Sequence, residues 1–224
     1  MRVRVFTSPE ALAAGVAAAV ARWLRHDGTD VGLAGGSTPR RAYERLRRAR
    51  VPWAEVTAWV TDERHVPVDH PDSNAGMALR SLFDHVPATL HEVPWDPDPE
   101  VAASRYEQTL RTILPGDGGP RPGLVMLGIG DDGHTASLFP GSPVLAETTR
   151  HFAAVEVPGR GWRLTATPPL LAGARRIIFV ASGSAKAESV AAAISGDRSL
   201  PAAVVAGLAE DVVWMLDREA AALL

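Results

Sequence analysis

The sequence predicts an α/β fold in which a mostly parallel β-sheet carries helices on both faces. Two observations lead to this prediction. Short runs rich in valine and isoleucine recur along the chain, and several are apolar at every position, as strands buried inside a parallel sheet are. Stretches with a helical pattern lie between these runs, and such alternation is typical of a doubly wound sheet.

The expected strands and helices alternate from the N-terminus onward. The strands are expected at residues 3–6, 31–34, 56–60, 124–129, 152–157, 176–181 and 212–216. The helices are expected at about residues 9–25, 39–50, 73–84, 98–113, 167–173 and 185–195. Ligands of such sheets bind at the carboxyl ends of the strands. The residues that follow each strand are therefore the first candidates for chemistry.

The N-terminal residues predict a strand followed by a capped helix. Arginine and valine alternate over residues 2–5, which is the period of a strand. Ser8 can then cap a helix, Pro9 suits its first position, and Glu10 is an acid in its first turn. We expect no signal peptide here, because a signal peptide needs a continuous apolar stretch and a cleavage site.

The composition is that of a globular protein, and we expect one domain over residues 1–224. Apolar residues make up 46% and charged residues 22%, and the net charge of −3 gives no overall attraction to nucleic acid or anionic membranes. The absence of cysteine excludes disulfides, thiolate catalysis and cysteine-based zinc sites. No stretch has the ~20 apolar residues of a membrane span. We expect a soluble, cytoplasmic protein that binds neither nucleic acid nor membranes.

Residues 40–50 carry six arginines in eleven positions. Such a run can bind nucleic acid. We favour a solvated helix face in which Glu44 pairs with Arg48 at i,i+4, because no nucleic-acid recognition motif accompanies the run.

The first candidate site is the glycine-rich turn after the strand at 31–34. Gly35 and Gly36 are followed by Ser37 and Thr38, which can cap a helix, and by Pro39, which suits its first position. The free N–H groups and the dipole of such a helix end bind anions. On this stretch alone, a phosphate site and an ordinary tight turn are equally good interpretations.

The strand at 56–60 delivers Asp62, Glu63 and Arg64 in succession. Such a set at a strand end is costly to desolvate unless it is used or paired, so an active site and a local ion pair both remain open. Histidines and aspartates at 65–72 can suggest a metal site. The intervening prolines set no recognised ligand spacing, and we do not favour one.

A formal G-x-G-x-x-G motif follows the strand at 124–129, over residues 128–133. We do not favour a dinucleotide site, because Asp131 and Asp132 would face the pyrophosphate with like charge. Pro140 also stops any helix where the dinucleotide fingerprint needs a long one. A nicotinamide-dependent enzyme remains an alternative.

Asp132, Gly133 and His134 form the most suggestive group in that stretch. A histidine is largely available as a base at neutral pH. Asp132 can orient or bias it if Gly133 lets the chain fold back. A histidine that only satisfies a loop hydrogen bond is the competing interpretation, and the flanking acids at a strand end favour a functional role.

Lys186 is the only lysine among 23 lysine and arginine residues. It is expected just inside a helix that residues 182–184 open, where a cation works against the dipole. An ammonium brings three donors to a point, whereas a guanidinium is a broad planar fork. A small site that grips one phosphate oxygen would favour lysine, although one residual lysine must also fall somewhere. Arg163 is a further candidate cation.

These stretches together resemble the 6-phosphogluconolactonase family. The matching segments are LAGGSTPRRAYERL, TDERHVPVDHPDSN, GIGDDGHTASLFPGSP, RLTATPPLL and GSAKAE, in the family's order between about residues 33 and 188. The most specific of them is DGHTASLFPG. The resemblance implies a Rossmann-like, three-layer α/β sandwich. It also implies hydrolysis of 6-phospho-D-glucono-1,5-lactone, a step of the oxidative pentose phosphate pathway, with no metal or organic cofactor.

The resemblance also implies roles for particular residues. The implied substrate-binding residues, on the phosphate side, are Gly35, Gly36, Ser37, Thr38, Arg163 and Lys186. The implied catalytic residues are His134, Asp132, Asp62 and Arg64, with His134 as the base. A sugar-phosphate lactone is then the expected partner.

Three alternatives remain. Glucosamine-6-phosphate deaminases share parts of these motifs, but Phe139 occupies the place of a glutamate that they typically carry there. A phenylalanine cannot shuttle protons, so deamination is disfavoured. A non-catalytic sugar-phosphate sensor has no need of an acid–base group at 134, and a related effector domain would carry a DNA-binding segment, for which we expect no room. A metal hydrolase is the third alternative.

Overall fold

The computed structural model describes all residues, 1–224, and places a seven-stranded parallel sheet at its centre. In spatial order the strands are β1 (Arg2–Phe6), β10 (Val212–Asp217), β9 (Arg176–Ala181), β6 (Leu124–Leu127), β2 (Asp30–Leu33), β3 (Thr57–Val60) and β5 (Thr89–His91). The parallel sheet expected from the buried valine-rich runs is therefore confirmed.

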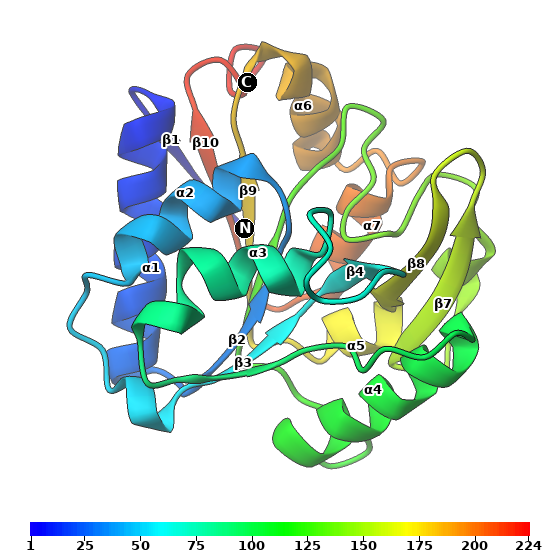
Figure 1. The fold of residues 1–224 in the computed structure, drawn as a ribbon. Coiled ribbons are helices and arrows are strands. Elements are labelled where there is room, and N and C mark those ends of the chain that lie inside the picture. The colour runs from blue at the N-terminus through cyan, green and yellow to red at the C-terminus, as the bar shows by residue number, and fades with distance from the viewer.

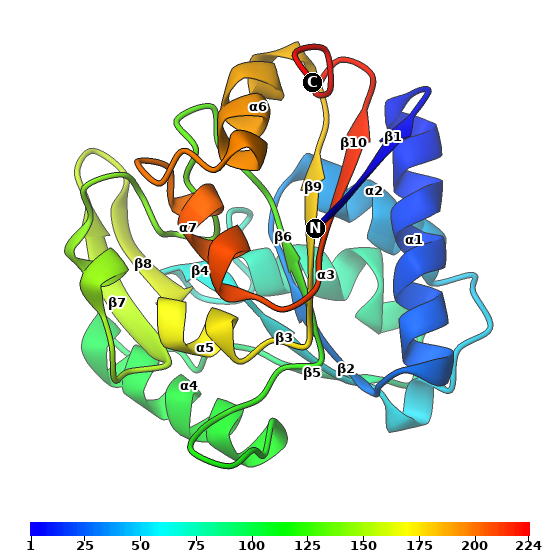
Figure 2. The ribbon, with the colours of Figure 1, turned by 180° about the vertical axis from the view of Figure 1, so that it is seen from behind.

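Seven α-helices cover the two faces of this sheet (Figures 1 and 2). They are α1 (Pro9–His26), α2 (Ser37–Leu46), α3 (Asn74–Ser81), α4 (Pro99–Ile113), α5 (Pro168–Ala172), α6 (Ala187–Ser195) and α7 (Pro201–Leu208). One hydrophobic cluster joins the sheet to α1, α2 and α3, and a second joins its other face to α4, α5, α6 and α7. The expected three-layer α/β sandwich is confirmed.

A second, smaller sheet stands beside the main one. Its strands are antiparallel, in the order β4 (Asp62–Arg64), β8 (Gly161–Ala166) and β7 (Phe152–Val157). The run at 152–157, expected among the strands of the parallel sheet, is therefore a hairpin strand instead. A continuous apolar run shows that a strand is buried but not which sheet it joins.

Several local predictions about the helices need correction. Helix α2 starts at Ser37 with Gly36 as its N-cap, so neither Ser37 nor Thr38 caps it and Pro39 is its third residue. Lys186 ends a short 3₁₀ turn (η4, Ser184–Lys186) and is the N-cap of α6, so it does not lie inside that helix. The tight turn absorbs residues that the sequence pattern assigned to the helix.

The capping side chains explain why the longest helices begin where they do. Ser8 accepts a hydrogen bond from the N–H of Ala11 at the start of α1, and a proline follows at the first helical position. Asp98 accepts from the N–H of Glu100 at the start of α4, again with a proline next. Each cap satisfies one of the N–H groups that a helix end leaves unpaired.

The strand order brings four strand ends together. Strands β9, β6, β2 and β3 are consecutive neighbours in the sheet and all run in the same direction. The chain builds outward in opposite directions from the β2–β6 pair, which makes this pair the switch point of the sheet. Ligands of such folds bind in the crevice above the switch point. The loops after these four strands therefore surround one place.

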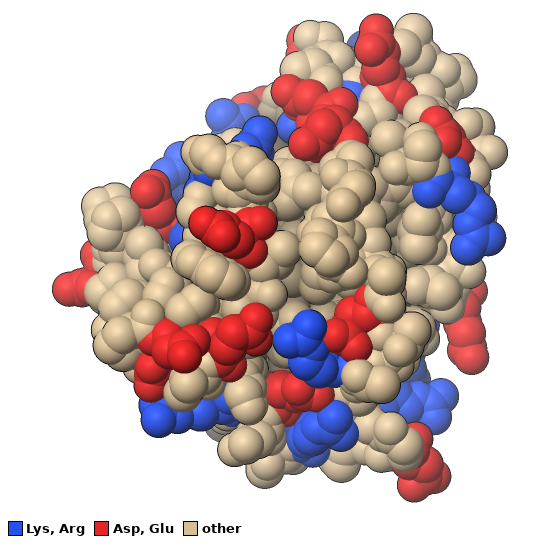
Figure 3. All heavy atoms as spheres, turned by 90° about the vertical axis from the view of Figure 1, so that its right-hand side faces the viewer, with Lys and Arg blue, Asp and Glu red and all other residues tan.

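The charged surface shows no evident polyanion-binding face on the side of β7 and β8. Acidic and basic side chains are interspersed there with uncharged surface (Figure 3).

On α2, Glu44 pairs with Arg40 at 3.9 Å and not with Arg48, so the predicted i,i+4 pair is wrong in its partner. None of the helices combines the length and the hydrophobicity needed to cross a bilayer.

Candidate active site

A cavity of about 210 Å³ opens at the carboxyl ends of the four central strands. It is lined by Ala34, Gly35, Gly36, Asp62, Arg64, Asn74, Gly128, Ile129, Gly130, His134, Ala136 and Lys186. These residues come from the segments that follow β2, β3, β6 and β9, which include β4 and the start of α3. The imidazole at 134 and the lone lysine therefore open into the same cavity.

His134 is held by Asp132 through two hydrogen bonds. Its Nδ1 lies 2.5 Å from Asp132 Oδ1, and its backbone N–H donates to the same oxygen at 3.1 Å. Desolvation pushes the pKa of Asp132 up, but the hydrogen bonds from His134 outweigh it and hold that pKa below its ordinary value. An ionised Asp132 accepts a hydrogen bond from Nδ1–H, which leaves Nε2, with no protein partner, as the basic nitrogen.

Two glycines make this arrangement possible. Gly133 has a φ of 77°, a conformation that side chains rarely adopt, and it folds the chain back so that His134 meets Asp132. A Cβ on Gly130 would lie 2.0 Å from His134 Nδ1, so only glycine leaves room for the ring. The glycines that resemble a dinucleotide motif serve here to seat an imidazole.

The face of the His134 ring is covered by Phe139. The two rings are stacked with their centroids 4.4 Å apart and their planes at 29°. The guanidinium of Arg160, from the turn between β7 and β8, lies 5.3 Å from the centre of the Phe139 ring. Phe139 thus fixes the plane of the imidazole and shields one side of it from water.

Asp62 lies across the cavity and is held by Ser137 and Asn74. Ser137 Oγ donates to Asp62 Oδ2 at 2.8 Å, and Asn74 Nδ2 donates to the Asp62 carbonyl at 2.9 Å. Burial raises the pKa of the Asp62 carboxyl, against the opposing effect of Ser137 and of the nearby Arg64, His134 and Arg163. The fold therefore holds this carboxyl at a cost.

A strained residue joins the histidine to Ser137. Ala136 has a φ of 48° and is the only non-glycine residue with a positive value. Such strain persists only where the surroundings impose it, and it is concentrated at functional sites. Thr135 Oγ1 donates to the Gly128 carbonyl at 2.8 Å on one side of Ala136, which helps impose it.

Arg64 and Arg163 are opposite each other in the β4–β8 register. Arg64 lines the cavity and donates to the Asp72 carbonyl at 2.6 Å. Desolvation, together with the charge of Arg64, lowers the pKa of Arg163. Arg163 is half-buried beside Arg64, on the same face of the small sheet, and is not among the residues that line the cavity. The two cations together favour an anion at this side of the site.

Glu63 faces away from the cavity and binds the N-terminal N–H groups of α3. The residue is 4% exposed, and its carboxylate accepts hydrogen bonds from the N–H groups of Arg64, Asn74 and Ala75 and from Ser73 Oγ. The alternation of a strand puts Asp62 and Arg64 on the cavity side and Glu63 on the other. Glu63 is therefore a structural residue, and it positions Asn74.

The glycine-rich turn brings the N-terminus of α2 to the cavity. Gly35 and Gly36 line it, and no side chain caps the helix at Gly36. The first N–H groups of α2 are therefore left for another acceptor, and the helix dipole favours a negative one. Ser37 and Thr38 belong to the first turn but do not line the cavity itself.

Lys186 approaches the site from the turn after β9. Asp217, at the end of β10, is buried and accepts hydrogen bonds from Ser182 Oγ at 2.5 Å and from the N–H of Gly183 at 3.1 Å, which fixes that turn. The ammonium of Lys186 forms an ion pair with Asp131. Lys186 is thus a positioned cation.

The structure brings most of the predicted site residues to one cavity. Those that line it are Gly35, Gly36, Asp62, Arg64, His134 and Lys186. Asp132 contacts His134 from outside the lining, while Ser37, Thr38 and Arg163 lie behind it. The sequence analysis did not predict Asn74 and Ser137 as site residues. Both lie inside the matching segments named there, and this was the only signal in the sequence that could have found them.

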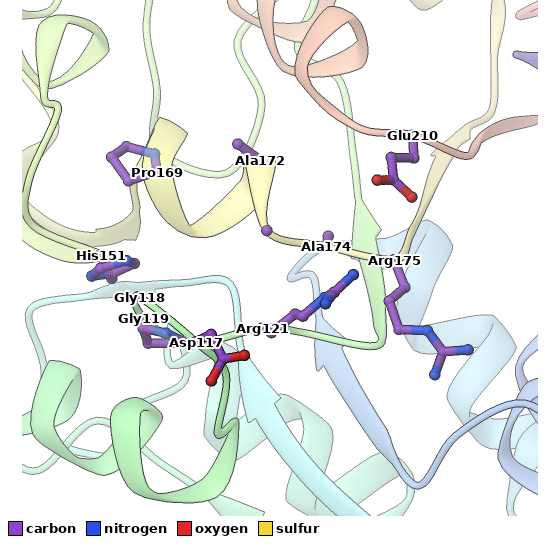
Figure 4. A pocket seen from close by; sticks show the side chains of 12 residues that line it. Asp117, Gly118, Gly119, Arg121, His151, Pro169, Ala172, Ala174, Arg175 and Glu210 are labelled. Atoms are coloured by element: carbon purple, nitrogen blue, oxygen red, sulfur yellow. The ribbon is translucent and has the colours of Figure 1, made fainter.

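A second hollow, of about 310 Å³, lies at the opposite end of the sheet (Figure 4). It is larger than the first, but its charged groups do not converge. Arg175 turns away to the Asp27 carbonyl, at 3.0 Å, and stacks over Trp23. His151 is engaged by Glu107 and Arg111. The histidine–carboxylate pair of this hollow, His151 with Glu107 at 3.2 Å, is longer than that of His134 with Asp132, and Glu107 is shared with Arg111.

The loop at 65–72 does not gather metal ligands. His65 Nε2 contacts the Asp96 carbonyl at 2.8 Å, and its ring stacks on Trp95. His70 Nδ1 and Asp72 are 3.9 Å apart at the surface. No three histidine or acidic side chains of the chain are grouped so that they could hold a metal ion.

Replacing Asp62 by asparagine is expected to stabilise the fold at neutral pH. A carboxyl whose pKa is raised by folding lowers stability once it ionises, and this penalty is absent below the unfolded-state pKa of about 3.9. In thermal unfolding, Asp62→Asn should have a Tm a few degrees above wild type at pH 8, since ~1 kcal/mol moves Tm by about 2–4 °C at this size. The difference should shrink toward pH 4. A lower Tm for the variant at every pH would contradict this account.

The fold and the cavity define an α/β protein with a histidine–aspartate pair and the cationic side chains of Arg64 and Lys186 at the switch point of its sheet. Comparison with known proteins agrees. Residues 7–214 match the family model described as "Glucosamine-6-phosphate isomerases/6-phosphogluconolactonase". The chain belongs to this family.

Individual relatives narrow the comparison. The chain is 38% identical over 205 residues to 6-phosphogluconolactonase of Synechocystis, covering 88% of this chain and 84% of that protein. It is 36% identical over 241 residues to 6-phosphogluconolactonase of Rattus norvegicus, with 99% and 93% covered. The structure of 6-phosphogluconolactonase from Trypanosoma brucei matches with a TM-score of 0.90 at 28% identity, over 100% and 98% of the two chains.

Proposed function

We propose that this protein is an enzyme that hydrolyses 6-phospho-D-glucono-1,5-lactone to 6-phospho-D-gluconate, a step of the oxidative pentose phosphate pathway. The observation that carries the proposal is the single cavity lined by His134, which Asp132 holds from outside the lining, and by Lys186 with the start of α2. A phosphorylated sugar lactone has both groups that such a cavity would address. We include a cytoplasmic location in the proposal, in keeping with a cysteine-free chain.

The phosphate binds in a cradle formed by residues 35–38, Arg163 and Lys186. The first N–H groups of α2 and the ammonium of Lys186 contact its oxygens, while Arg163 adds positive charge from its position beside Arg64. Anchoring the phosphate holds the lactone carbonyl near His134, so binding energy from a remote group fixes the reacting one.

His134 activates the attacking water. Asp132 accepts a hydrogen bond from Nδ1–H and so keeps Nε2 free. Nε2 takes a proton from water as the water oxygen attacks the lactone carbonyl carbon. The Phe139 ring against the imidazole limits its rotation, which keeps Nε2 in place. The first step ends with a tetrahedral intermediate and a protonated His134.

The intermediate then opens to the product. The carbon–oxygen bond to the ring oxygen breaks, and His134 returns its proton to that oxygen, which becomes the free hydroxyl of the open sugar acid. The negative charge on the former carbonyl oxygen is met by Arg64 or by backbone N–H groups of the 128–130 segment, both of which line the cavity. One base and one set of donors suffice for this reaction.

A deaminase is disfavoured by the group next to the base. Ring opening and isomerisation of an amino sugar need several proton transfers, and the side chain stacked on His134 is Phe139, which can transfer none. A metal hydrolase would need ligands that the chain does not group. Release of ammonia from glucosamine 6-phosphate, or loss of activity with a chelator, would favour these alternatives.

The test of the function is a coupled assay on freshly generated 6-phosphogluconolactone. The rate with the protein is compared with the spontaneous decay and with the rate on unphosphorylated glucono-1,5-lactone. We expect hydrolysis of both lactones above background, with the phosphorylated lactone hydrolysed far faster than the unphosphorylated one. A protein that binds this lactone without accelerating its decay would be a sensor and not an enzyme.

Replacing Lys186 by alanine should weaken the phosphorylated substrate selectively. Hydrogen bonds to charged groups contribute about 1.5–3 kcal/mol, so kcat/KM for the phosphorylated lactone should fall about 10- to 100-fold. Lys186→Arg should recover only part of the loss, because a planar guanidinium does not replace a point-like ammonium. Steady-state kinetics on both lactones check this. An equal loss on the unphosphorylated lactone would show that Lys186 does not serve the phosphate.

A further inference from the structure

The ammonium of Lys186 is paired with the carboxylate of Asp131. The two side chains form an ion pair, in which the Asp131 side chain is 67% exposed and the Lys186 side chain 29%. The Asp131 carboxylate accepts no other hydrogen bond. The neighbouring Asp132 makes the contacts to His134. Asp131 can therefore leave Lys186 without disturbing the rest of the site.

We propose that Asp131 is a built-in competitor for the substrate's phosphate on Lys186. This inference rests on the phosphate role proposed above for Lys186. A carboxylate oxygen on the ammonium takes the position that a phosphate oxygen would take. A phosphate dianion and a carboxylate on one ammonium repel each other, so phosphate entry turns the exposed Asp131 side chain out into solvent.

This competition lowers the apparent affinity for every phosphate ligand by the same factor. The factor is set by the fraction of molecules in which Lys186 is free. Because Asp131 is largely exposed, the factor is modest, about two- to fivefold, as for other exposed ion pairs. The return of Asp131 to Lys186 also favours release of the phosphorylated product.

Ligands differ in their ability to displace Asp131 from Lys186. A neutral sugar lactone has no charge with which to displace Asp131, and a ligand with a single carboxylate only matches it. A phosphate dianion carries more charge than the group that it displaces. The competition nevertheless lowers the affinity of every ligand that binds Lys186, so Asp131 limits phosphate affinity and does not add to the preference for the phosphorylated lactone.

The test is Asp131→Asn in the full-length protein. We expect the KM for the phosphorylated lactone and the inhibition constant of inorganic phosphate to fall together, by about two- to fivefold, the range of exposed ion pairs. The KM for unphosphorylated glucono-1,5-lactone should stay unchanged. If Asp131 instead positions Lys186, the KM and the inhibition constant rise. Either a rise or no change overturns the proposal.

Two further variants complete the experiment. Glu188→Gln removes one negative charge from an exposed residue two positions from Lys186 that makes no contact with it. An equal gain in phosphate affinity there would assign the effect to long-range charge and overturn the competition. In a Lys186→Met background, Asp131→Asn should gain nothing. If Lys186→Met alone leaves phosphate inhibition unchanged, the phosphate role of Lys186 fails, and that result is distinct from the outcome for Asp131.

Discussion

Replacing His134 by alanine is expected to lower kcat on 6-phosphogluconolactone by about 10²–10⁴, the usual contribution of a positioned general base, with little change in KM. The KM is retained because the phosphate cradle lies on other loops, after β2 and β9. The measurement is the coupled assay with the spontaneous hydrolysis subtracted, which must be done carefully because this lactone also opens unaided. Turnover at the wild-type rate would remove His134 from the mechanism.

Two controls separate the loss of the base from other effects. His70→Ala removes an exposed histidine of the 65–72 loop that does not line the cavity, and this variant should keep wild-type kcat. Asp132→Asn keeps the shape of the site but removes the charge that orients Nδ1, so it should lower kcat less than His134→Ala does. An Asp132→Asn variant as active as wild type would mean that the imidazole needs no such orientation.

The central strands of the main sheet could be predicted because they are buried on both faces and so are apolar at nearly every position. The elements that the sequence analysis missed lack such a signal. Strand β8 begins with exposed residues, and β4 and β5 have only three residues each. Helix α7 is apolar almost all round, so it shows no helical period. Its burial against α5 and α6 is what makes it a helix.

The location of the site could also be predicted, because the ends of neighbouring parallel strands must meet. The pairing of side chains within the site could not. Ser137 with Asp62, and Lys186 with Asp131, join residues 75 and 55 positions apart in the chain. Such partners depend on the register of loops, which no local pattern encodes. The same limit explains why the structural role of Glu63 could not be predicted. The sequence showed it only as one acid of a cluster, whereas its partners lie at the start of α3.

Replacing Glu63 by glutamine is expected to be among the most destabilising single changes in the chain. The carboxylate serves four donors in a buried site, and a glutamine side chain can accept with only one oxygen. Leaving buried N–H groups unpaired costs about 1–3 kcal/mol each. We expect a loss of about 2–5 kcal/mol in the free energy of unfolding, measured by urea denaturation. Glu55→Gln, at an exposed glutamate, should stay within about 0.5 kcal/mol of wild type.

The same variant distinguishes a structural from a catalytic role for Glu63. Because its carboxylate faces α3 and not the cavity, the Glu63→Gln protein that remains folded at low temperature should retain far more turnover than His134→Ala. Its KM should rise moderately, since the N-terminus of α3 places Asn74 in the lining. A variant with wild-type stability and no turnover would make Glu63 a participant in the chemistry, and the assignment of the two acids on β4 would then have to be reversed.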